Sequence, residues 1–200
     1  MRYKILIIGY GSIGAKYYNL LKKQKNLFKL FVLSKRFNSR KNFVSTRNKI
    51  LSLNPDLIII SSRTSDHFKD LNLVNKFFKN KKILIEKPIF SKMEKISNTS
   101  NKIFVGYNLR FHPLLQKLIK LIKNKRIYSI NINCSSYLPL WRKNVHYSLS
   151  SSSTDIKGGG VLRDLSHELD YLLLFMKKIK INSFQNKKIS NLNIKTKDYF

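Results

Sequence analysis

Short apolar runs alternate with longer mixed segments through the first half of the 200-residue chain. Runs dominated by Ile, Leu, Val and Phe are typical of parallel strands that are buried on both faces. They cover residues 5–8, 28–33, 57–60, 82–85 and 103–106. The segments between them predict helices over residues 12–24, 40–53, 65 or 66 to 80, and 91–97. This alternation predicts an α/β fold with a doubly wound parallel sheet over residues 1–108.

The second half of the chain has a different pattern. Pro113 begins an amphipathic segment that predicts a helix over residues 113–123. Residues 126–137 alternate between apolar and polar side chains, which predicts a strand with one exposed face. After a polar, loop-like stretch at 141–154, three glycines precede a predicted helix over residues 161–176. The last segment, 179–200, predicts one or two further short strands.

Glycines follow the first strand in G-x-G-x-x-G spacing, at Gly9, Gly11 and Gly14. In this spacing the first glycine allows a sharp turn, the second lets backbone approach a pyrophosphate, and the third allows close helix–strand packing. A tight turn alone would also explain them, but a buried strand before and a helix after favour a dinucleotide site. Ser12 and Ile13 begin that helix and are candidate cofactor-binding residues, since its N-terminus attracts phosphates.

The end of the second strand predicts the form of the dinucleotide. An acidic residue about 20 positions after the glycines usually holds the ribose 2′-hydroxyl. This chain has Ser34, Lys35 and Arg36 instead, which suit a 2′-phosphate and favour NADP over NAD. Two basic residues in a lysine-rich chain could equally carry no meaning. Ser61 and His67 follow the third strand at the expected crevice, although a surface histidine is as good an interpretation of His67.

Composition narrows the class of protein. Hydrophobic residues make up 42% of the chain, enough for a core, and no run reaches the length of a membrane span. The net charge is +30, but the lysines are scattered through every segment, so we expect no specific nucleic-acid partner and no membrane partner. A single cysteine, Cys134, excludes an internal disulfide framework and favours the cytoplasm.

Four motifs together resemble the Gfo/Idh/MocA oxidoreductases, the relatives of glucose–fructose oxidoreductase and inositol dehydrogenase. They are the glycine turn, E-K-P at 86–88, GYNLRFHP at 106–113 and GGGVLRDLSHELDYL at 158–172. The resemblance implies an NAD(P)-dependent enzyme that moves a hydride between nicotinamide and a sugar-type substrate. The stretch YLPLWRK, with the H-E-L-D variant, is similar to members that act on amino or nucleotide-linked sugars. No metal is implied.

The resemblance also implies two domains, a dinucleotide-binding domain over 1–110 and a partial substrate-binding or dimerisation domain over 111–200. The second is expected to be an incomplete α+β open sheet, because family members generally have a larger one. An incomplete sheet exposes unpaired edges and an apolar face, so we expect a homo-oligomer. The alternative function is a non-catalytic dinucleotide-binding protein. A basic nucleic-acid-binding protein is a weaker alternative.

Lys87 and His167 are the candidate catalytic residues. Lys87 follows a strand's carboxyl end, where it can hydrogen-bond both the ribose and the reacting oxygen. In the family the matching lysine is catalytic, Pro88 after it is often cis, and Glu86 is a candidate cofactor-binding residue beside it. His167 suits proton transfer near neutral pH. Asp164, three positions before it on the predicted helix, shares its face and can orient it or bind a sugar hydroxyl. A histidine packed beside Tyr171 is the alternative.

The remaining candidates lie on the substrate side. By resemblance Tyr107, Asn108 and Arg110 line the substrate, with Arg110 able to bind a carboxylate or phosphate through two hydrogen bonds. Trp141 and Arg142 offer a stacking plane and a cation that suit a sugar ring or an anionic group. A structural anchor explains those two equally well.

Overall fold

The chain divides into two compact units, which are described separately below. The computed structural model describes residues 2–34, 43, 44, 48–176 and 178–200. Unit 1 is Met1–Gly106 and unit 2 is Tyr107–Phe200.

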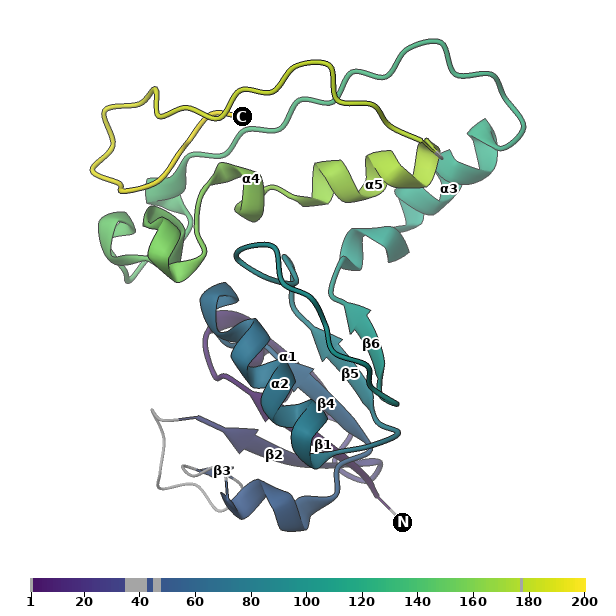
Figure 1. The fold of residues 1–200 in the computed structure, drawn as a ribbon, viewed down its shortest axis with the longest axis vertical. Helices are drawn as coiled ribbons and strands as arrows, with labels where there is room; N and C mark the ends of the chain where they lie inside the picture. The colour runs from purple at the N-terminus through teal and green to yellow at the C-terminus, as the bar shows by residue number, and fades with distance from the viewer. Residues whose placement is uncertain (1, 35–42, 45–47, 177) are drawn as a thin grey trace. The chain divides into compact units, whose positions relative to one another are not determined.

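Unit 1 is a parallel sheet, shown with its helices in Figure 1. Its strands are β1 (Tyr3–Ile8), β2 (Phe28–Leu33), β3 (Phe43–Val44), β4 (Leu57–Ile60), β5 (Lys82–Ile85) and β6 (Lys102–Val105). The six strands lie in the order β3-β2-β1-β4-β5-β6, and every neighbouring pair is parallel. The chain first builds outward from β1 to β3 and then crosses to the other side of β1. The doubly wound sheet predicted from the apolar runs is confirmed, and its switch point lies between β1 and β4.

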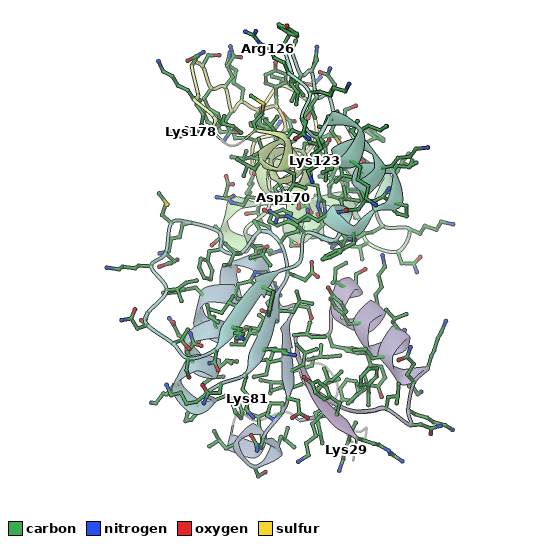
Figure 2. The ribbon with its side chains drawn as sticks, turned by 90° about the vertical axis from the view of Figure 1, so that its right-hand side faces the viewer. Lys29, Lys81, Lys123, Arg126, Asp170 and Lys178 are labelled. Carbon is green, nitrogen blue, oxygen red and sulfur yellow. The ribbon has the colours of Figure 1, made fainter. Side chains whose placement is uncertain are left out.

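Two helices cover opposite faces of this sheet, as Figure 2 also shows. Helix α1 (Ser12–Lys22) packs Tyr17, Tyr18 and Leu21 against one apolar cluster, and α2 (His67–Phe77) contributes Leu71 and Val74 to the other. Because both faces are covered, strand residues of either orientation are buried, which explains the continuous apolar runs.

Two helix predictions in unit 1 are wrong. Within the described part of 40–53, β3 pairs in parallel with the end of β2, and Asn48–Leu53 forms a 3-10 helix (η1). Pairing of Phe43 and Val44 with a buried strand overrides the weak helical pattern there. Residues 91–97 form no helix. A segment of that length needs packing to offset the cost of nucleation, and its Met93 side chain is fully exposed.

Unit 2 contains helices α3 (Pro113–Ile122), α4 (Val161–Asp164) and α5 (His167–Phe175). The helix predicted over 161–176 is therefore broken, because Leu165 leaves helical geometry with φ −101° and ψ 28°. Short 3-10 helices fill the connections of the chain: η2 (Thr64–Asp66), η3 (Asn108–Phe111), η4 (Leu138–Leu140), η5 (Tyr147–Leu149), η6 (Ser151–Ser153) and η7 (Asp155–Lys157).

The strands predicted in unit 2 do not form. In the described residues, 126–137 is irregular and 179–200 makes only isolated bridges, Thr154 with Lys195 and Lys187 with Tyr199. An alternating segment becomes a strand only when a neighbour completes its hydrogen bonds, and the described part of unit 2 supplies none. Among the described residues of unit 2, Ile194 is the one buried apolar side chain, so this unit has little core of its own.

No helix in the described part of the chain is both long and apolar enough to span a membrane.

Candidate functional site

The turn between β1 and α1 leaves no room for side chains at two of its glycines. Gly9 has φ +92°, and a Cβ atom there would lie 2.5 Å from the backbone nitrogen of Ser62. A Cβ atom on Gly14 would lie 2.2 Å from the carbonyl oxygen of Gly9. These two glycines are therefore required by close contact between the turn, the helix and the end of β4.

Gly11 is different, because its surroundings are open. Apart from its own neighbours in the chain, no described residue has an atom within 4 Å of the position that a Cβ atom would take there. Gly11 is the N-cap of α1 and offers no side chain to the first turn, where Ser12 and Ile13 are exposed. The unpaired N–H groups of this turn therefore face open space, which is the arrangement that binds a phosphate.

The end of β4 supplies polar groups to the same turn. The Ser61 hydroxyl donates to the carbonyl oxygens of Gly9, at 3.1 Å, and Ile8, at 3.3 Å. The neighbouring Ser62 hydroxyl is buried and has no hydrogen-bond partner among the described residues. A buried hydroxyl beside an open glycine turn fits a site completed by a dinucleotide.

Ser34 directly follows β2 and is buried, at 9% exposure. Lys35 and Arg36, predicted to meet a 2′-phosphate, lie outside the described residues.

His67 does not lie on the surface. Its side chain is 1% exposed, and its Nδ1 lies 3.1 Å from the carbonyl oxygens of both Pro88 and Ile89. Its Nε2 lies 3.2 Å from the carbonyl oxygen of Ser62. Both ring nitrogens are thus directed at backbone carbonyl oxygens within unit 1. The contact of His67 with the ribose or nicotinamide stays a prediction.

The E-K-P motif follows β5, and the bond between Lys87 and Pro88 is cis, as the family resemblance implies. The Tyr17 hydroxyl on α1 donates to Glu86 Oε1 at 2.6 Å. Burial raises the pKa of Tyr17 well above its usual range, and the hydrogen bond to Glu86 and its negative charge raise it further. Tyr17 therefore stays a proton donor to Glu86. Lys87 itself is half-buried.

In unit 2, three predicted residues lie near the start of α5. The Tyr107 ring stacks edge-on against the His167 ring, with centroids 5.6 Å apart, and its hydroxyl is 3.5 Å from the Ser166 hydroxyl. Asn108 is exposed on η3. Because α4 ends at Asp164 and α5 begins at His167, these two residues do not share the face of one continuous helix.

Arg110 is already paired. Its Nε donates to Asp170 Oδ2 at 2.8 Å and its Nη2 to Oδ1 at 2.5 Å, so one carboxylate receives both bonds. The hydrogen bond to Asp170 raises the pKa of Arg110 above its ordinary value, against the opposing effect of burial. The Asp170 side chain is 7% exposed. These two bonds join η3 to α5. Binding of a substrate anion by the Arg110 guanidinium stays a prediction.

A cavity of about 510 Å³ within unit 2 holds two more predicted residues, Trp141 and Asp164. Ser136, whose hydroxyl accepts a hydrogen bond from Trp141 Nε1 at 2.6 Å, also lines it. Tyr107, Arg110 and His167 do not, and Arg142 lies at a smaller neighbouring hollow that Trp141 also lines. The predicted substrate residues therefore fall into two groups within this unit.

Two residues that bind predicted site residues were not singled out from the sequence. Tyr17 and Asp170 are the partners of Glu86 and Arg110. Glu168 lies beside Cys134, whose pKa is raised by burial and then by its hydrogen bond to Glu168. The H-E-L-D stretch contains both acids, but sequence spacing gave no sign of their partners, which are distant along the chain.

The sequence matches the GFO_IDH_MocA family, described as an oxidoreductase family with an NAD-binding Rossmann fold, over residues 3–102. No match was found among curated proteins.

Solved structures show the same fold at low identity. The WlbA dehydrogenase of Bordetella pertussis, in complex with NADH and UDP-GlcNAcA, is 16% identical over 88% of this chain, with a TM-score of 0.65. The WlbA dehydrogenase of Thermus thermophilus, with NAD and UDP-GlcNAcA, is 17% identical over 86%, with a TM-score of 0.65. The putative oxidoreductase yvaA of Bacillus subtilis is 19% identical over 100%, with a TM-score of 0.71. The matches cover 58%, 62% and 58% of those three chains, respectively.

Proposed function

The chain belongs to the Gfo/Idh/MocA family of oxidoreductases, and from this premise we propose that it is an NAD(P)-dependent sugar dehydrogenase or reductase. It would transfer a hydride between nicotinamide and the hydroxyl or keto carbon of a sugar, or of a nucleotide-linked or amino-sugar derivative. The solved relatives that hold NAD or NADH together with UDP-GlcNAcA support this substrate class.

The main support comes from the glycine turn, where Gly9 and Gly14 are closely surrounded by other atoms and Gly11 is not. Gly9 and Gly14 are required by the packing of unit 1, whereas no internal contact requires a glycine at position 11. An open position at the N-terminus of α1, beside the switch point of the sheet, is where a pyrophosphate binds in this fold.

The residues of the chain then have the following roles. A bound nicotinamide supplies the carbon that accepts or donates the hydride. Lys87, at the end of β5, holds the reacting oxygen through its ammonium group. His167 moves the hydroxyl proton, and Asp164 orients it or binds a sugar hydroxyl. Trp141 offers a stacking face to a part of the substrate away from the reacting carbon, in the cavity of unit 2, because His167 does not line that cavity.

The finer parts of the proposal are the preference for NADP, a homo-oligomeric state and a cytoplasmic location. The first rests on Ser34, Lys35 and Arg36 in place of an acid after β2. The second rests on the sparse core of unit 2, and the third on the single cysteine.

The first test is a titration of NADPH and of NADH into the protein, followed by nicotinamide fluorescence. We expect both to bind and NADPH to bind more tightly. Absence of binding by either would remove the basis of the enzyme proposal, and tighter binding of NADH would remove only the NADP preference.

The second test is Lys87→Ala with turnover of nucleotide-linked sugars as the readout. We expect turnover to fall by about a hundredfold or more, since one catalytic donor of this kind contributes that much, with dinucleotide affinity little changed. Lys92→Ala is the matched control, because that side chain is 79% exposed and lies five residues away on the same loop. Equal turnover in the two variants would contradict the role of Lys87.

A second candidate function is dinucleotide binding without catalysis. It is favoured by the near absence of buried apolar side chains in the described part of unit 2, which carries His167. Tight dinucleotide binding without turnover of any sugar would support this alternative.

A further inference from the structure

The loop that carries Lys87 is tied to other elements on both sides of that residue. On the N-terminal side, Tyr17 of α1 donates a 2.6 Å hydrogen bond to Glu86. The two residues are 69 positions apart in the sequence, so this bond connects the helix of the glycine turn directly to the E-K-P motif.

The Glu86 side chain has little freedom to move. A Cβ atom on Gly106 would lie 2.9 Å from Glu86 Oε1, so the carboxylate sits against the backbone at the end of β6. The Glu86 amide also donates to the carbonyl oxygen of Ile60 at 2.9 Å. Main chain and side chain of Glu86 are therefore both held.

On the C-terminal side, His67 of α2 holds the next two residues. Its Nδ1 lies 3.1 Å from the carbonyl oxygens of Pro88 and Ile89, and its Nε2 lies 3.2 Å from that of Ser62. A carbonyl oxygen only accepts, so the ring nitrogen that carries hydrogen donates to it, and a neutral ring has one such nitrogen. With the hydrogen on Nδ1, the ring donates to the loop after β5, and its Nε2 edge lies against the loop after β4, beside the glycine turn.

We propose that Tyr17 and His67 are positioning residues for Lys87. Tyr17 fixes Glu86, the residue before Lys87, and His67 fixes the two residues after it. The backbone that carries the lysine side chain is therefore held by α1 and α2. This inference rests on the proposed role of Lys87. Neither residue touches the reacting atoms; both act through the loop.

The test measures how readily Lys87 reacts with an acylating reagent, by peptide mass spectrometry, with the exposed Lys92 as internal reference. Lys87 is half-buried, so a loosened loop should expose it. In Tyr17→Phe and in His67→Leu we expect its labelling relative to Lys92 to rise severalfold while the chain remains folded, as circular dichroism at the labelling temperature checks. His67→Asn, which keeps one amide donor, should restore part of the protection.

Tyr18→Phe is the matched control, since Tyr18 follows on the same helix and packs its ring against Tyr10 and Phe43. It should leave the labelling of Lys87 unchanged. Unchanged labelling in both Tyr17→Phe and His67→Leu, or a rise matched by Tyr18→Phe, would overturn the inference. Since the labelling needs neither turnover nor bound dinucleotide, failure of the proposed function and failure of this inference give different results.

Discussion

At the scale of single residues, substitutions in the glycine turn can distinguish a glycine needed for packing from one needed for dinucleotide binding. Gly11→Ala places a methyl group in open space, at a backbone φ of −80° that alanine adopts readily, so the melting temperature should stay near that of the parent chain. The same methyl group would occupy the path of a pyrophosphate, and NADPH affinity should fall by about tenfold or more. Calorimetry and fluorescence titration measure the two effects.

Gly14→Ala, unlike Gly11→Ala, should lower the stability of the folded chain. Its Cβ atom would lie 2.2 Å from the Gly9 carbonyl oxygen and 2.7 Å from the Ser61 hydroxyl oxygen, so α1 would have to move. Overpacking of this kind costs about 1–3 kcal/mol, and we expect a lower melting temperature even without dinucleotide. If Gly11→Ala were the less stable of the two, the assignment of these glycines would be wrong.

Some residue-level predictions depended on contacts that a sequence does not contain. Gly9, Gly11 and Gly14 were identified because their spacing is local. His67 and Arg110 were identified as candidates by position, but their partners lie on other elements, at Pro88 and Asp170. Spacing along one helix could not show that the polar atoms of these side chains are already engaged.

At the scale of elements, five of the six strands of unit 1 could be predicted to within two residues at each end, whereas β3 falls in a segment predicted to be helical. The predicted bounds at 28–33, 57–60 and 82–85 are those of β2, β4 and β5. A strand buried on both faces is apolar along its buried length, so the apolar runs mark these strands even where an exposed lysine, such as Lys29, lies within one. The alternating pattern over 126–137 did not predict a strand correctly, because a segment with one exposed face forms a strand only beside a partner strand. The break in the helix at Leu165 could not be predicted, because residues 161–176 contain no Pro or Gly.

The contact between Tyr17 of α1 and Glu86 after β5 should stabilise the folded chain less as the pH rises. The folded-state pKa of Tyr17 is raised, so the folded chain retains a proton that the unfolded chain loses above about pH 10. The contribution of Tyr17 to stability is therefore complete below pH 10 and declines as the pH rises beyond it. Tyr17→Phe should show a shallower loss of melting temperature than the parent chain above pH 10. Parallel curves would contradict this prediction.

The contact between η3 and α5 depends on Arg110 and Asp170. Asp170→Asn removes the charge that accepts both guanidinium bonds, and we expect the free energy of unfolding of unit 2 to fall by about 1–3 kcal/mol. Trp141, the single tryptophan of the chain, lies in this unit and reports urea unfolding. Asp155→Asn is the control: its carboxylate pairs with Arg163 but is 54% exposed, so the loss should be below about 1 kcal/mol.

At the scale of the whole molecule, two opposing features decide whether copies associate. Basic side chains extend from both units, as the labelled Lys29, Lys81, Lys123 and Lys178 show in Figure 2, and the net charge of +30 makes copies repel one another. Unit 2 nevertheless exposes large apolar side chains on α3 and on η3, which precedes it. Phe111, Leu114 and Leu121 are 82%, 70% and 62% exposed. Apolar surface of this kind favours association once repulsion is weakened.

Salt should therefore reveal self-association. The Debye length falls from about 10 Å at 0.1 M to about 3 Å at 1 M salt, which removes most of the repulsion but leaves the apolar attraction. We expect the sedimentation coefficient to rise between these concentrations. The double variant Leu114→Gln/Leu121→Gln should suppress that rise without loss of fold, because both side chains are already mostly exposed. A single monomeric species at both salt concentrations would mean that the exposed residues of α3 do not drive contact between copies, and the homo-oligomer proposal would lose its support.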